Sequence, residues 1–197
     1  MDNKRVSAKF RGFTLLELMV VLAIAAILVT IATPSLALLL QSQTRSSAVN
    51  TFLADMRYAR SEAIRRGGGV TLCRSEFPEA TSPNCSTTTG NSGSGWASGW
   101  IVFHDLNADG LKDAADPLLR VQSPVAAIES ILEGGAGTPG TPSTFRFTGT
   151  GRLFDLSSAT KLTFGGSSYT ADAQRVVCIS FAGRARIAGD GASVCAD

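Results

Sequence analysis

The longest apolar run of the chain lies near its start. It covers 28 residues, from Phe13 to Leu40, and Glu17 is its only charged residue. A helix needs about 20 apolar residues to cross a bilayer, so this run is long enough to span one. A carboxylate at the bilayer centre costs roughly 2.5–3.5 kcal/mol on insertion scales. We therefore expect Glu17 to serve a particular partner.

From Gln41 the chain turns polar, but apolar residues continue to recur at helical spacing. They are Val49, Phe52, Leu53, Met56, Ala59, Ala63 and Ile64. Three glycines, Gly67–Gly69, follow Arg66, and glycine is a usual stop signal for a helix. The pattern predicts one long helix from about Phe13 to Arg66, with a transmembrane half and an amphipathic half.

After the glycines, the sequence predicts short strands separated by turn residues. The expected strands are Val70–Cys73, Gly99–His104, Leu118–Gln122, Ala127–Leu132, Thr144–Phe147, Leu162–Phe164, Arg175–Phe181 and Ala185–Ala188. The predicted fold is α+β, with a long N-terminal helix packed on antiparallel β-sheet. We expect three segments: a basic leader at 1–12, a transmembrane helix at 13–40 and a globular domain at 41–197.

The formal net charge of +2 hides an uneven distribution of charges. Four of the 18 Lys and Arg residues precede the apolar run, and from Gln41 onward 14 basic residues face 14 acidic ones. The globular domain is thus neutral overall, so any contact with nucleic acid must come from a local patch. The basic leader predicts that the N-terminus stays on the cytoplasmic side.

The four cysteines form two pairs that are close in sequence, Cys73 with Cys85 and Cys178 with Cys195. Beyond a membrane, an even number at short spacing predicts two local disulfides, although four cysteines allow three connectivities. A zinc site is the alternative. It is weaker, because the chain has no Cys-x-x-Cys and only one histidine, His104.

The junction between the basic leader and the apolar run reads Gly12, Phe13, Thr, Leu, Leu, Glu17. This arrangement resembles the signature of type IV pilins and pseudopilins. The resemblance implies that a prepilin peptidase cleaves between Gly12 and Phe13 on the cytoplasmic face, and that the new Phe13 terminus is N-methylated. Glu17 would then pair with the Phe13 amine of a neighbouring subunit. Such pairing relieves the burial of two charges and fixes the register between helices.

The rest of the chain is similar to the GspH/FimT group of minor pilins and pseudopilins. The similarity rests on "YARSEAIRR" then "VTLC", "GWIVFHDLNADG", "LLRV", "FRFTGTGRL" and "VVCISFAGRARI". Together these pieces cover nearly the whole chain. They do not separate the minor pilins of pili from the pseudopilins of type II secretion.

The stretch "DLNADGLKDAAD" has the acidic spacing of an EF-hand calcium loop. Its candidate ligands are Asp105, Asn107, Asp109, Asp113 and Asp116. An EF-hand needs flanking helices, whereas both flanks here are predicted strands. The alternative is a β-hairpin whose Asp and Asn side chains bond to their own backbone. We expect no other cofactor.

The sequence contains no catalytic motif. It has no Gly-x-Ser-x-Gly, no P-loop and no metalloprotease motif, and its single histidine stands alone. We therefore expect a protein that is not an enzyme.

The C-terminal stretch "FAGRARIAGDGASVC" places Arg184 and Arg186 two positions apart after Gly183. In an extended segment such residues project to the same side, where two guanidiniums can bind adjacent phosphates bidentately. A solvated hairpin is the alternative. FimT-type minor pilins of DNA-uptake pili are similar here, with a Gly-Arg-x-Arg element that contacts DNA. That resemblance implies DNA binding by Gly183, Arg184 and Arg186.

These observations lead to one functional expectation and two alternatives. We expect a minor type IV pilin, most like FimT, held in the inner membrane by a single span with its C-terminal domain in the periplasm. It would then join other pilins in the pilus at the cell surface and bind extracellular double-stranded DNA without sequence preference, for natural transformation. The alternatives are a structural minor pilin that primes assembly and a GspH-like pseudopilin of a type II secretion system.

Overall fold

A computed structural model describes residues 13–86, 93–125, 128–134, 144–154, 156 and 159–195, apart from the side chains of residues 32–35, 37 and 38. The chain divides into two compact units, Met1–Leu40 and Gln41–Asp197. The first unit is helical from residue 15 onward, and the second contains every strand of the described residues.

Helix α1 runs from Leu15 to Arg66, close to the predicted bounds. It ends in a glycine cap. Gly67 adopts a φ of 82°, and the N–H of Gly68 donates to the carbonyl of Ala63 at 2.8 Å. This bond, from a residue to the carbonyl five positions earlier, is the 6→1 bond of a Schellman motif. The glycines therefore end the helix as the sequence predicts.

Within the first unit, the described apolar side chains of α1 are exposed. Examples are Leu15, Leu16, Met19, Leu22 and Ile27, each at least 60% exposed. In the part of the chain that the structure describes, no helix combines the length and the apolarity required for a membrane span.

The strands form two four-stranded sheets. Sheet A consists of β1 (Val70–Arg74), β2 (Trp100–His104), β3 (Leu118–Gln122) and β5 (Thr144–Phe147), in the order β3-β2-β1-β5. Sheet B consists of β4 (Ser130–Glu133), β6 (Thr160–Gly165), β7 (Arg175–Ile179) and β8 (Ala185–Gly189), in the order β4-β6-β7-β8. All neighbouring strands within each sheet are antiparallel. The predicted fold class is therefore confirmed. Two short 3₁₀-helices, η2 (Trp96–Ser98) and η3 (Ala171–Ala173), precede β2 and β7.

The strand bounds differ most from the prediction in sheet B. β4 begins later than expected, at Ser130, and β7 ends two residues early, at Ile179. The chain leaves β7 because the N–H of Gly183 donates to the carbonyl of Ser180 at 2.9 Å, which closes a tight turn into β8.

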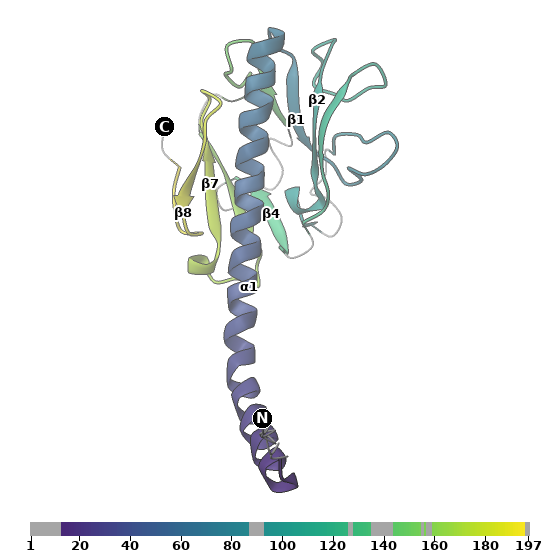
Figure 1. Ribbon diagram of the computed structural model, residues 1–197. Coiled ribbons are helices and arrows are strands. Elements are labelled where there is room, and N and C mark those ends of the chain that lie inside the picture. Colours follow the sequence, from purple (N-terminus) through teal and green to yellow (C-terminus); the bar gives the residue numbers. More distant parts are fainter. Residues whose placement is uncertain are drawn as a thin grey trace, which may run out of the picture. The chain divides into compact units, whose positions relative to one another are not determined.

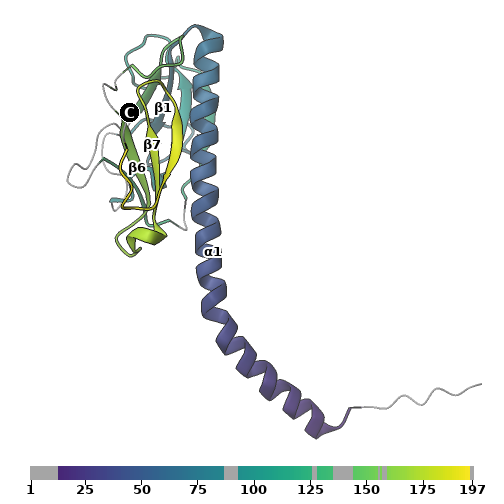
Figure 2. The ribbon, with the colours of Figure 1, turned by 90° about the vertical axis from the view of Figure 1, so that its left-hand side faces the viewer.

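In the second unit, one apolar core joins α1 to both sheets. Figure 1 shows β7 and β8 to one side of the helix and β1 and β2 to the other, and Figure 2 shows both sheets on the same face of the helix. Phe52 lies at the centre of this core. Its ring centroid is 5.5 Å from those of Trp96 and Trp100, 6.3 Å from Phe145 and 5.9 Å from Phe164, all edge to face. Such aromatic pairs add about 0.5–1.5 kcal/mol each beyond their buried area.

The predicted apolar face of α1 is buried with one exception. Val49, Phe52, Leu53, Met56, Ala59 and Ala63 are at most 5% exposed, whereas Ile64 is 52% exposed. The prediction for Ile64 was wrong. Ile64 lies in the last turn of α1, beyond Ala63, which is the last helix residue in the buried core.

Candidate functional site

The N-terminal processing site is described only in part. Gly12 lies outside the described residues, and Phe13 is 79% exposed. The backbone N–H of Glu17 donates to the hydroxyl oxygen of Thr14 at 3.2 Å. Thr14 thus caps the N-terminus of α1, and Glu17 stands at the N3 position. A carboxylate in the first turn is favoured by the positive end of the helix dipole.

The predicted arginine element begins in the turn between β7 and β8. Gly183 has a φ of 72°, in the left-handed region that favours glycine. A Cβ at this position would lie 2.3 Å from the carbonyl oxygen of Gly151, so a larger residue would displace backbone. Glycine is therefore required at the first position of Gly-Arg-x-Arg for a structural reason.

Arg184 and Arg186 follow this turn, and both are exposed. Ala185 lies between them, pairs with Ile179 across the β7–β8 ladder and packs against the core. Because side chains alternate along a strand, the two arginines lie on the opposite face of sheet B, away from the core.

Both predicted disulfides are present. Cys73–Cys85 and Cys178–Cys195 each have a Cα–Cα distance of 5.5 Å, and the described residues contain no free cysteine. The zinc alternative is wrong for these four residues, because no thiolate is left to bind a metal. Cys178 lies opposite Arg186 in the strand register, so the second disulfide fastens the C-terminal segment beside the arginine element.

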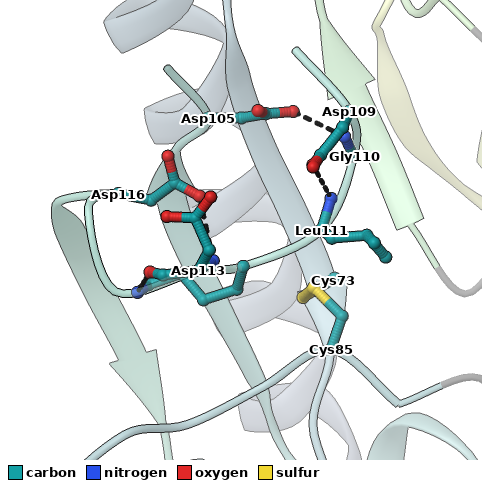
Figure 3. The surroundings of a disulfide bond; sticks show 9 residues. Cys73, Cys85, Asp105, Asp109, Gly110, Leu111, Asp113 and Asp116 are labelled. Carbon is teal, nitrogen blue, oxygen red and sulfur yellow. Dashed lines mark hydrogen bonds between the residues drawn. A yellow bond between two sulfur atoms is a disulfide. The ribbon is translucent and has the colours of Figure 1, made fainter. Parts of the chain in front are cut away.

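The Asp-rich loop connects β2 to β3, which pair as an antiparallel hairpin. Its carboxylates accept hydrogen bonds from backbone N–H groups of the same loop, and Figure 3 shows the bonds at Asp105 and Asp109. Asp105 accepts from Gly110 at 2.8 Å, Asp109 from Leu111 at 2.7 Å, Asp113 from Ala115 at 2.8 Å, and Asp116 from Leu106 at 2.9 Å and Asp113 at 3.1 Å. The geometry is that of the self-bonded hairpin.

The loop does not present a ready cation site. The Asn107 side-chain amide donates to Asp109 at 2.9 Å and to Asp113 at 3.3 Å, so an N–H group stands between two carboxylates. Among the described residues, no three His, Cys, Asp or Glu side chains form a group that could hold a metal ion. Asp105 is 3% exposed, and its Oδ1 has no hydrogen-bond partner in the described structure. Calcium binding by this loop stays a prediction.

The sequence did not predict a buried contact between an acidic and a basic side chain of the two sheets. Glu133 of β4 accepts a hydrogen bond from the Trp96 indole and lies 3.9 Å from Nη1 of Arg74 in β1. Burial raises the pKa of Glu133 to about 7, although the Trp96 N–H and the Arg74 charge act in the opposite direction. Burial also lowers the pKa of Arg74. No local pattern marks this pair, because its members lie far apart in the sequence.

A second buried carboxylate lies within the apolar face of α1. Asp55 accepts hydrogen bonds from the Trp100 indole at 2.8 Å and from Arg120 of β3 at 2.5 Å. The position of Asp55 beside Met56 could have predicted this contact from the sequence, because an acid inside an apolar stripe needs a buried partner.

The long helix, exposed and apolar in the first unit and packed on antiparallel sheets in the second, defines a pilin-like protein. The chain belongs to the type IV pilin-like GspH/FimT family. The family described as "Type II transport protein GspH" matches residues 48–183, and the "Prokaryotic N-terminal methylation motif" matches residues 7–33.

Family membership defines the class of function. The chain is a minor pilin or pseudopilin of a type IV pilus or type II secretion system, a structural protein and not an enzyme. The methylation motif implies a membrane-anchored pilin that is processed by a prepilin peptidase and associates with other pilins in a filament.

Two crystal structures of the type IV minor pilin FimU of Pseudomonas aeruginosa strain PAO1 resemble this chain. The structure in space group P21 is 21% identical with a TM-score of 0.52, and the match covers 75% of this chain and 92% of that chain. The structure in space group P65 is 20% identical with a TM-score of 0.47, and the match covers 75% and 98%. At such identity the first likeness shows the fold alone. No curated protein sequence matches the chain.

Proposed function

We propose that the chain is a FimT-like minor pilin of a type IV pilus that binds extracellular double-stranded DNA for natural transformation. The Gly183–Arg186 element carries the proposal. Its support is the exposure of Arg184 and Arg186 on one face of sheet B, directly after a turn that only glycine fits. A guanidinium binds phosphate oxygens through two N–H donors at once, so this pair suits neighbouring phosphates of a DNA backbone.

The strand register adds a cation to this face. Lys161 of β6 and Arg186 of β8 both lie opposite Cys178 of β7. Residues directly opposite each other project to the same face of a sheet, so Lys161 and Arg186 flank the disulfide there. No ion pair of the described residues engages Lys161 or Arg184. The face therefore offers positive charge from two strands.

The binding of one chain should be modest. The globular domain is neutral overall, so long-range attraction is weak. Two to four phosphate contacts give a salt slope of about −2 to −4, at roughly 0.9 per phosphate of duplex DNA, and an affinity in the micromolar range or weaker. Several copies along a filament would raise this by avidity. Duplexes of different sequence should bind alike, since phosphate contacts carry no base information.

The test is a DNA-binding titration of the full chain, purified in a nonionic detergent, with duplexes of unrelated sequence. Arg184→Gln combined with Arg186→Gln should abolish binding, and the same change in cells should abolish transformation while pili still form. The matched control, Arg65→Gln with Arg175→Gln, removes the same two charges. It should bind like the parent, because Arg65 pairs with Glu62 and Arg175 donates to backbone carbonyls.

We also propose the processing and assembly steps for the N-terminal segment. A prepilin peptidase cleaves between Gly12 and Phe13, Phe13 is then N-methylated, and the span at 13–40 holds 41–197 in the periplasm before assembly. Glu17 pairs with the Phe13 amine of a neighbouring subunit. The support is the basic leader, the glycine at its end and the single acid of the apolar run.

Two variants separate these steps in cells. Gly12→Val should leave the precursor uncut on an immunoblot, and Glu17→Ala should be cleaved but poorly incorporated into filaments. Thr14→Ala removes the helix cap but keeps the carboxylate, so it should assemble if Glu17 acts through the neighbouring amine. Normal incorporation of Glu17→Ala would contradict the pairing.

A pseudopilin of a type II secretion system is the second candidate function, because the matching family is described as a type II transport protein. Deletion of the chain would then stop secretion and leave transformation normal. If the deletion instead reduces piliation and the arginine variant still binds DNA, the chain is a structural minor pilin that primes assembly.

A further inference from the structure

The turn that carries Arg184 packs against a second arginine-bearing segment. The carbonyl oxygen of Gly151 lies 2.3 Å from the point where a Cβ of Gly183 would stand, so the two glycines meet backbone to backbone. Arg152 follows Gly151 just as Arg184 follows Gly183. The β5–β6 loop and the β7–β8 turn therefore touch at these two glycines, and in each segment an arginine is the next residue.

Arg152 is held over an aromatic ring. Its Cζ lies 5.1 Å from the ring centroid of Phe181, and the Phe181 carbonyl accepts a hydrogen bond from the N–H of Leu153 at 2.9 Å. Thr148 fixes the backbone of Arg152, since the Thr148 hydroxyl accepts from the Arg152 N–H at 3.2 Å. Stacking on a ring face holds a guanidinium in place without using its N–H donors. No acceptor among the described residues engages those donors.

Arg60 of α1 reaches the same place. A Cβ on Gly151 would lie 2.8 Å from its Nε, and this Nε is buried with no hydrogen-bond partner in the described structure. Arg60 and Arg152 thus lie at the contact between Gly151 and Gly183, and Arg184 follows Gly183 in the chain. No ion pair of the described residues engages any of these three arginines. Like charges gathered in this way raise the local positive potential and favour an anion.

Other arginines of the second unit are bonded within the chain. Arg65 and Arg66 pair with Glu62, Arg120 pairs with Asp55, and Arg175 donates to the carbonyls of Asp172 and Gln174. Arg175 begins β7, at the opposite end of that strand from the turn. It therefore serves as a control for an arginine of the same sheet without the same setting.

We propose that Arg152 is a further phosphate-binding residue of the DNA interface, and that Phe181 is the positioning residue that holds it ready. This inference rests on the proposed DNA-binding function and extends its site from the β7–β8 turn to the β5–β6 loop. Arg60 lies at the Gly151 end of this contact and adds to the positive potential there. The guanidinium of Arg152 is already ordered before DNA arrives, so little conformational freedom is lost on binding.

The test measures DNA affinity at a series of salt concentrations, with the full chain in a nonionic detergent and a labelled duplex. Arg152→Gln should weaken binding roughly two- to fivefold, as for one exposed ion pair, and should reduce the salt slope by about 0.9. Arg152→Lys should keep the slope. Phe181→Leu should lower the affinity and keep the slope, because the charge remains, and Phe181→Tyr should restore the affinity.

The outcomes distinguish this inference from the proposed function. If Arg184→Gln with Arg186→Gln abolishes binding while Arg152→Gln matches Arg175→Gln in affinity and slope, Arg152 is not part of the site and the proposed function stands. If the Arg184 and Arg186 double variant binds as the parent does, the proposed function itself fails. Thermal unfolding of each variant checks that it is folded. Should Arg152→Gln not fold, a Phe181→Leu variant that binds like the parent overturns the inference.

Discussion

Two charged hairpin connections in the second unit use their charges in opposite ways. The β2–β3 loop carries Asp105, Asp109, Asp113 and Asp116, and each of these carboxylates accepts a backbone N–H of its own loop. The β7–β8 turn leads into Arg184 and Arg186, which are exposed. One loop is closed on itself, and the other presents its charge to the surroundings.

The sign of the charge explains much of the difference. A carboxylate only accepts hydrogen bonds and a loop is rich in backbone N–H donors, so an acidic loop can satisfy itself. A guanidinium only donates and needs acceptors. In the β7–β8 turn the carbonyls of Ser180, Phe181 and Arg184 already accept backbone N–H groups. No ion pair of the described residues engages Arg184, and its exposed guanidinium can donate to another molecule, which on our account is phosphate.

The largest expected effect concerns the disulfides beside the two hairpins. Cys73–Cys85 lies near the acidic loop (Figure 3) and packs on Ile101 and Phe103, which are fully buried. Changing both cysteines to serine should lower the free energy of unfolding by about 3 kcal/mol in the chain-entropy model, plus the cost of exposing this cluster. On chain entropy alone, Cys178–Cys195 should stabilise the fold slightly more than Cys73–Cys85, because its sequence separation is 17 residues and not 12.

Urea unfolding of the two double-serine variants shows whether the buried cluster or the chain entropy makes the larger contribution to stability. We expect the Cys73 and Cys85 variant to be the less stable, because burial outweighs the small entropy difference. The reverse order would show that the cluster beneath the acidic hairpin adds little. Mass spectrometry of a non-reducing digest should show both linked peptides in the parent.

The next prediction compares the stability that one charged residue of each hairpin contributes. Asp116 is 4% exposed and accepts two backbone N–H groups. Asp116→Ala leaves both donors without their acceptor and should cost about 2–3 kcal/mol, whereas Asp116→Asn keeps one oxygen and should cost less. Arg184→Ala should stay within about 0.5 kcal/mol of the parent, as an exposed side chain. Equal losses in thermal unfolding would mean that the two hairpins do not differ as described.

The two hairpins also show which features of the fold and of the site can be predicted from the sequence. Strand alternation and turn residues predicted the strands on either side of both hairpins, the short cysteine spacings predicted the disulfide pairs, and helical periodicity predicted the helix face down to Ala63. All of these depend on local spacing. The neighbours of the arginine turn could not be predicted. Gly151 and Gly183 meet only after β5 and β7 have joined different sheets, and the Arg74–Glu133 contact arises in the same way. Long-range packing of this kind leaves no local pattern.

A further effect should appear in the pH dependence of stability. The pKa of Glu133 is raised from 4.5 to about 7 by burial, so the folded state holds its proton where the unfolded state has lost it. Its contribution is fully present below pH 4.5 and is lost as the pH rises to about 7, by up to about 1.4 kcal/mol per pH unit. Glu133→Gln should flatten this fall in denaturant titrations between pH 5 and 8. An unchanged slope would contradict the assignment.

The smallest expected effect is that of calcium on the acidic hairpin. Because its carboxylates already accept backbone N–H groups, excess calcium should shift the unfolding temperature by less than about 1 °C, since a ligand stabilises only when it binds the folded state more tightly. A rise of several degrees that disappears in Asp109→Asn would show that the loop opens to form the EF-hand-like site.

The central claim is that the basic hairpin, and not the acidic one, is the surface that meets DNA. It is tested most directly by measuring DNA affinity after changing two charges in each. Arg184→Gln with Arg186→Gln should abolish binding, whereas Asp109→Asn with Asp113→Asn should leave it unchanged or slightly tighter. Binding by the arginine variant at the parent's affinity and salt slope would contradict the account.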